Sequence, residues 1–211
     1  MKFSAILALA GAAASVMAVP LAVDVSAPDP DQVTVEGVTY GGSGCPQGTA
    51  SVSLSLDKKS FTVILDEYIV AVGSGYTVTD ARKNCQLNVK LHYPSGFQYS
   101  VYSSDYRGYA ELDEGVTGLQ KATYYFGGST VQSSVSTAFK GPMSQDYLIH
   151  DEIPFTSTVW SPCGEIASLN INSQVRVENS ANPKGMGFLT TDSIDGKVSF
   201  KVGVKWQVCP E

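Results

Sequence analysis

Charged side chains are scarce in this chain of 211 residues: 16% are Asp, Glu, Lys or Arg, against about 25% in an average soluble protein. The formal net charge is −6, and an acidic surface repels the phosphate backbone of nucleic acids. A nucleic-acid partner is therefore disfavoured. Glycine, serine, threonine and tyrosine supply the polarity instead, a mixture typical of extracellular β proteins.

The sequence also lacks an apolar run of the roughly 20 residues that a membrane-spanning helix needs. Its apolar stretch at residues 6–17 is shorter, follows the basic Lys2 and ends in a small-x-small cleavage pattern at Val16-Met17-Ala18. We therefore expect a signal peptide over residues 1–18, secretion to the extracellular space and no membrane span. We expect residues 19–31 to form a polar, Pro-rich lead-in and residues 32–211 to form a single domain.

Four cysteines follow the expected signal peptide, at Cys45, Cys85, Cys163 and Cys209. Their separations of 40, 78 and 46 residues lack the close C-x₂₋₄-C pairs of a zinc site, so we expect no metal and no cofactor. An even count in a secreted chain indicates two disulfides, with three pairings open. Because neighbouring strands usually follow one another in sequence, we expect Cys45–Cys85 and Cys163–Cys209.

Alternation of apolar and polar residues is the dominant pattern. In the final segment Phe200, Val202, Val204 and Trp206 alternate with polar residues that include Lys201 and Lys205, as a half-buried antiparallel strand requires. Residues 50–56 and 85–92 repeat the pattern. Further candidate strands are residues 33–40, 61–72, 97–102, 117–126, 130–139, 155–160 and 168–177.

Turn sequences separate these segments, and no stretch carries an apolar stripe with helical spacing. The turns are Pro94-Ser95-Gly96, Gly127-Gly128, Gly141-Pro142, Asn182-Pro183 and Asp195-Gly196. About ten short strands at this spacing predict an all-β fold. We expect an antiparallel β-sandwich of jelly-roll or Greek-key type, stapled by the disulfides.

Candidate catalytic residues are few, because the chain has only two histidines, His92 and His150. Asp151 adjoins His150, but a neighbour in sequence is not an orienting partner in a Ser-His-Asp triad. Both histidines are expected at the surface. The segment from Asp192 to Gly196 superficially resembles a calcium loop but lacks the spaced oxygen ligands of an EF-hand. We expect a hairpin turn at Asp195-Gly196, with a loop calcium site as the alternative.

Paired acids occur at Asp66-Glu67, Asp113-Glu114 and Asp151-Glu152. A glycosidase needs two carboxylates facing one cleft. Adjacent residues of a strand point to opposite faces, so a single pair cannot supply both. Carboxylates from separate strands can, which keeps a carbohydrate-active hydrolase as an alternative function.

Tyrosines are concentrated between residues 93 and 125. Rings on a sheet face can stack on sugars, whereas cross-strand pairing in the core is the competing role. The candidate ligand-binding residues are Tyr99, Tyr102, Tyr106 and Tyr109.

Several short words occur in order along the chain: Gly44-Cys45-Pro46, Asn84-Cys85-Gln86, Tyr106-Arg107-Gly108-Tyr109, Gly141-Pro142, Trp160-Ser161-Pro162-Cys163-Gly164, Leu169-Asn170-Ile171-Asn172 and Asp192-Ser193. In these short sequence motifs the chain resembles a family of small secreted proteins of filamentous fungi, catalogued as a domain of unknown function. The resemblance extends over roughly residues 33–209. The resemblance implies secretion, an all-β fold and a four-cysteine framework. It implies no activity and no catalytic residues.

Two classes of function follow. The first is a secreted, monomeric binding or interaction protein without enzymatic activity. Its partner would be a cell-wall polysaccharide or a host surface protein, the latter making it a host-directed effector. The alternative is the carbohydrate-active hydrolase. The lack of a catalytic motif favours binding.

Overall fold

The computed structural model describes residues 27–154, 158–164, 166–190 and 198–210. The expected signal peptide, most of the lead-in, and the segment with Asp192, Asp195 and Gly196 lie outside the described residues. Within the described part of the chain the helical structure is one short 3₁₀ turn, Pro30–Gln32.

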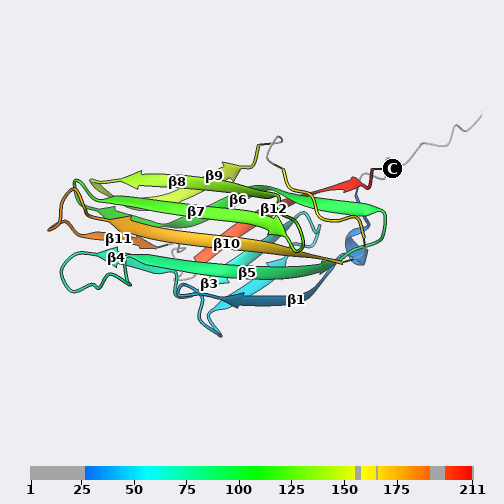
Figure 1. Cartoon of the computed structure of the whole chain (residues 1–211), viewed down its shortest axis with the longest axis horizontal. Helices are drawn as coiled ribbons and strands as arrows, with labels where there is room; N and C mark the ends of the chain where they lie inside the picture. Colours follow the sequence, from blue (N-terminus) through cyan, green and yellow to red (C-terminus); the bar gives the residue numbers. More distant parts are fainter. Residues whose placement is uncertain (1–26, 155–157, 165, 191–197, 211) are drawn as a thin grey trace, which may run out of the picture.

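Two antiparallel sheets pack face to face, which confirms the expected β-sandwich (Figure 1). Sheet A has the order β1 (Thr34–Gly41), β5 (Arg82–His92), β10 (Ile166–Glu178), β7 (Thr117–Phe126) and β8 (Gln132–Lys140). Sheet B has the order β2 (Ala50–Leu54), β3 (Ser60–Leu65), β12 (Val198–Val208), β6 (Phe97–Leu112), β11 (Gly187–Thr190) and β4 (Ile69–Val72), with β9 (Met143–Glu152) paired to the other edge of β6. Most connections cross between the sheets, as in jelly rolls.

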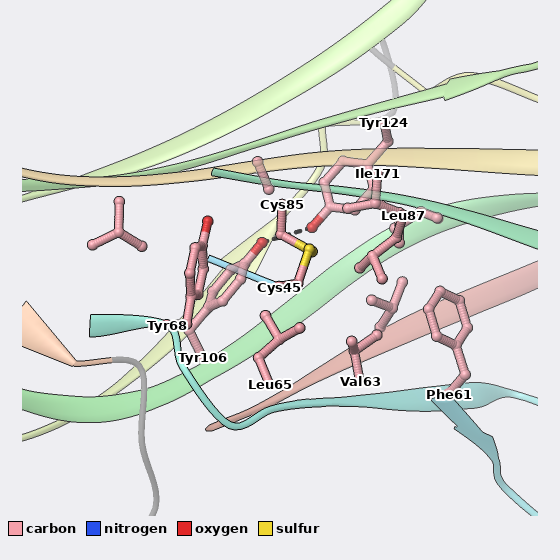
Figure 2. Close-up of a cluster of buried hydrophobic side chains, with 14 of the residues drawn as sticks. Cys45, Phe61, Val63, Leu65, Tyr68, Cys85, Leu87, Tyr106, Tyr124 and Ile171 are labelled. Carbon is pink, nitrogen blue, oxygen red and sulfur yellow. Dashed lines mark hydrogen bonds between the residues drawn. A yellow bond between two sulfur atoms is a disulfide. The ribbon is translucent and has the colours of Figure 1, made fainter. Parts of the chain in front are cut away.

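The alternation read from the sequence places one face of each sheet in a common core. Figure 2 shows side chains from the two layers interdigitating, with the Tyr106 ring of β6 reaching toward Tyr124 of β7. Their hydroxyl oxygens are 2.7 Å apart and hydrogen-bonded, so each ring buries its body while its polar tip finds a partner. Burial raises the pKa of Tyr124 to about 12, so both hydroxyls stay protonated.

The last strand, β12, largely follows the expected alternation, and the side chain of Phe200, also expected in the core, lies outside the described part of the strand. Val202 and Val204 are buried, Trp206 is half-buried and Lys201 is exposed. Lys205 is half-buried because its ammonium lies 5.2 Å from the centre of the Trp160 ring.

Strand β6 runs for 16 residues, ten beyond the end expected at residue 102. The period of two breaks there, because its pairing with β12 goes from Ser103↔Gly203 directly to Val101↔Val204. Tyr102 is thus an extra residue that bulges from the ladder. The bulge moves the inward-facing positions from odd to even numbers. A strand predicted from strict alternation therefore ends at residue 102, although β6 continues beyond it.

Other strands differ from expectation for related reasons. The candidate at residues 61–72 is two strands, β3 and β4, and the sequence did not indicate β9 or β11. β9 has polar residues on both faces because it lies at the sheet edge beside β6. Of the candidate at 155–160, residues 155–157 are outside the described chain, and Trp160 forms only an isolated bridge to Ser100.

The disulfides are Cys45–Cys85 and Cys163–Cys209, as expected from locality. Cys45 and Cys85 are completely buried beneath β5, where Figure 2 shows them among the core side chains. Cys163 is exposed and Cys209 half-buried, at the end of the sandwich where β12 finishes.

Candidate functional site

The four tyrosines proposed from the sequence do not share a surface. Tyr99 and Tyr106 are core residues, 0% and 1% exposed, and no ligand on the surface can reach their rings. Tyr102 and Tyr109 are on the outer side of β6, 43% exposed and half-buried respectively. The bulge at Tyr102 explains the division. Tyr99 and Tyr106 are seven positions apart, an odd number that would place them on opposite faces of a regular strand, and the extra residue turns both inward.

Both histidines are at the surface. His92 ends β5, with its Nδ1 3.7 Å from a carboxylate oxygen of Glu36. His150 on β9 hydrogen-bonds Asp105, its cross-strand neighbour on β6, and this bond raises the pKa of the imidazole. The orienting carboxylate is thus Asp105, and not the adjacent Asp151.

The Asp151-Glu152 pair divides between the two faces of β9, as strand geometry requires. Glu152 is exposed, whereas Asp151 faces β8 and accepts a hydrogen bond of 3.3 Å from the Thr137 hydroxyl. Burial raises the pKa of the Asp151 carboxyl. The two acids therefore cannot act together on one substrate.

Replacing Asp151 with asparagine is expected to raise the melting temperature slightly at pH 7, by roughly 1–3 °C, because Asn removes a partly desolvated charge and keeps an acceptor for Thr137. The raised pKa means that the folded state holds its proton more tightly than the unfolded state. The gain should therefore appear as pH rises above about 4, the carboxyl pKa in unfolded chains, and vanish below it. Thermal melts across pH test this, with Glu152→Gln as the exposed control. A gain that persists at pH 3 contradicts the explanation.

A surface hollowed on several sides lies at one end of the sandwich, around the loop of residues 73–81 that joins β4 to β5. Figure 1 shows this loop at the same end as the turn between β10 and β11. Gly73 and Gly75 have φ of +118° and +91°, a backbone region that favours glycine. Asp80 fixes the rest of the loop, because its carboxylate accepts hydrogen bonds of 2.8 and 2.7 Å from the backbone and hydroxyl of Thr77.

Tyr76 projects from the middle of this loop with 47% of its surface exposed. It lines three separate hollows of about 400, 500 and 420 Å³. The first hollow is also lined by Asp66, Glu67, Ile69, Ala71, Asp80 and Lys83. An aromatic ring therefore stands between shallow depressions whose walls carry several carboxylates.

The other two hollows add apolar and amide groups. Val78, 92% exposed, and Asn179 line the second; Met186 and Phe188 line the third together with Glu111. Small-ligand sites combine aromatic and apolar walls with a few converging polar groups, and the hollows around Tyr76 carry groups of both kinds. Sequence reasoning missed Tyr76 because it lies outside the tyrosine-rich segment. The two glycines before it were the signal available.

The two sheets and the two disulfides define a disulfide-bonded β-sandwich protein. The chain belongs to the family described as domain of unknown function (DUF4360), whose model matches residues 31–209. An uncharacterized secreted protein of Arthroderma benhamiae is 54% identical over 184 residues, which are 87% of this chain and 75% of that protein. The protein is accordingly secreted. Among the described residues no helix is long and apolar enough to span a membrane.

Two solved structures show faint similarity. TmCBM61 in complex with β-1,4-galactotriose has a TM-score of 0.23 and 14% identity over 83% of this chain and 90% of that one. The enzymatically active domain of tailspike protein 4 of bacteriophage CBA120 has a TM-score of 0.22 and 13% identity over 86% of this chain and 20% of that one. Scores this low carry no argument about the ligand.

Proposed function

We propose that the protein is a non-catalytic extracellular binding protein that holds an oligosaccharide at the Tyr76 end of the sandwich. One observation carries the proposal: the half-exposed Tyr76 ring is a shared wall of three hollows. An aromatic face suits the C–H surface of a sugar ring, and carboxylate oxygens accept hydrogen bonds from its hydroxyls.

The chemistry of the nearby acids favours binding over hydrolysis. A glycosidase needs one carboxyl with a raised pKa to protonate the leaving group. Asp80 is the opposite case, because the hydrogen bonds from Thr77 lower the pKa of its carboxyl. Asp113 of the third hollow is engaged as an acceptor, 2.7 Å from the backbone nitrogen of Met186. These acids are suited to holding a ligand and fixing the loop.

Tyr76→Ala is expected to weaken binding of a soluble oligosaccharide about tenfold, equivalent to about 1.4 kcal/mol, because the stacking surface is lost. The measurement is calorimetric titration against a panel of neutral oligosaccharides, with reducing-end release followed in parallel. Tyr102→Ala is the matched control, since Tyr102 is similarly exposed on a different part of the molecule. Binding that survives Tyr76→Ala but not Tyr102→Ala places the site on β6 instead. Hydrolysis of any member of the panel overturns the non-catalytic proposal.

A further inference from the structure

The outer face of sheet A carries a ladder of side-chain amides at its centre. β5 and β10 are adjacent central strands, and three successive outward positions on each are Asn or Gln. The strand register pairs them directly, amide opposite amide. The pairs, which we call the amide ladder, are Asn84↔Gln174, Gln86↔Asn172 and Asn88↔Asn170.

Two rows of this ladder extend across all five strands without a charged side chain. Around the pair Asn88↔Asn170, the register places Thr39 of β1, Tyr125 of β7 and Gln132 of β8. Around the pair Gln86↔Asn172, it places Gly41, Thr123 and Ser134. All of these residues are half-buried or exposed. In an acidic protein, an uncharged platform of amides and hydroxyls thus covers the middle of one face.

Strand stability does not explain the amide ladder. Asn is depleted in β-strands, and outward positions of central strands favour β-branched residues such as Thr. Six amides at six such positions contradict this local preference, and departures of this kind occur mainly at functional sites.

The amides are held in place and remain accessible. The Asn88 amide donates to Asn170 Oδ1 at 3.0 Å, and the Gln86 amide reaches over β10 to donate to the Tyr125 hydroxyl at 3.2 Å. Asn172, the middle residue of the ladder on β10, is exposed, and its side chain makes no hydrogen bond to the described part of the chain. The ladder is thus ordered before a ligand arrives, and the Asn172 amide at its centre still offers a donor and an acceptor. Such an ordered surface lowers the entropic cost of binding.

We infer that the amide ladder binds a neutral polysaccharide chain lying across sheet A. Such a chain presents closely spaced hydroxyl groups, which amides match as both donors and acceptors. Within the two rows a charged polymer meets no opposite charge, and the cations Lys121, opposite Gln174, and Lys90, beyond Asn88, lie at their borders. A protein partner would need buried aromatic or apolar anchors, and the Tyr125 ring is the only large one in the two rows. This surface is separate from the Tyr76 end and does not depend on it.

The test is sedimentation of the full secreted protein with particles of cellulose and of an insoluble β-1,3-glucan. Polygalacturonate gel and chitosan are the charged comparisons. The double variant Gln86→Thr/Asn172→Thr removes one pair of the ladder while improving strand propensity, so it should fold at least as stably. We expect its binding to at least one neutral particle to fall tenfold or more. Gln145→Thr, an exposed amide on β9 of the other sheet, is the matched control and should bind as wild type.

Three results overturn the inference: no binding of the wild-type protein to neutral particles, undiminished binding by the folded double variant, or stronger binding to a charged polymer. Asn172→Asp provides a second check, because it places one charge at an exposed position and should also abolish binding without affecting the fold. Tyr76→Ala, measured in parallel, separates the two surfaces. If Tyr76→Ala loses particle binding while the double variant keeps it, the polymer binds at the Tyr76 end, and the ladder inference fails while the proposed function stands.

Discussion

Gly108→Ala is expected to destabilise the protein by about 3 kcal/mol or more, lowering the melting temperature by roughly 6–12 °C. Gly108 lies on the inner side of β6, where the Tyr147 ring of β9 passes directly over it. A Cβ added there would lie 2.0 Å from the Thr190 carbonyl oxygen and 2.5 Å from the Tyr147 hydroxyl. Neither atom can retreat freely, because the Tyr147 hydroxyl donates a buried 2.6 Å hydrogen bond to that carbonyl.

The methyl group must therefore displace Tyr147, breaking the hydrogen bond that ties β9 to β11 across β6. A buried carbonyl left without its donor adds to the steric cost. Gly37→Ala is the control, because Gly37 is also in a strand and a Cβ there would meet nothing within 4 Å. Urea unfolding of the two variants is the measurement. Equal effects would mean that the close approach of Tyr147 to Gly108 is not a constraint on the fold.

Much of the fold was readable from the sequence because the period of two reports directly on which side of a strand is buried. The expected strand at residues 117–126 matches β7, and locality identified both disulfides. The pattern failed where a tertiary feature replaced it. The bulge at Tyr102 hid the second half of β6, and the position of β9 at a sheet edge removed its alternation.

The candidate site was less predictable, because it depends on which distant segments meet. Tyr76 is separated in sequence from Glu111 and Met186, and only the sandwich brings them around one hollow. The amide ladder was visible as alternating amides in two segments. Their register, Gln86 opposite Asn172, depends on the pairing of β5 with β10, which sequence alone does not give.

Removing the buried disulfide is expected to have the larger effect of the two disulfide deletions. The loops closed by Cys45–Cys85 and Cys163–Cys209 are similar, with separations of 40 and 46 residues. In the loop-entropy model each bond then contributes about 4 kcal/mol by restricting the unfolded chain. The entropy term does not distinguish them, so the difference must come from the folded state.

Cys45 and Cys85 are completely buried, whereas Cys163 is exposed and Cys209 half-buried. Cys45→Ala/Cys85→Ala therefore removes two sulfur atoms from a packed core and leaves a cavity, which adds about 1–2 kcal/mol to the loop term. Cys163→Ala/Cys209→Ala loses mainly the stabilisation that comes from restricting the unfolded chain. We expect losses of about 5–6 and about 4 kcal/mol respectively, measured by urea unfolding with each variant's own m-value, because either deletion lets the unfolded chain expand. A larger loss from the Cys163–Cys209 deletion would show that anchoring the end of β12 matters more than packing beneath β5.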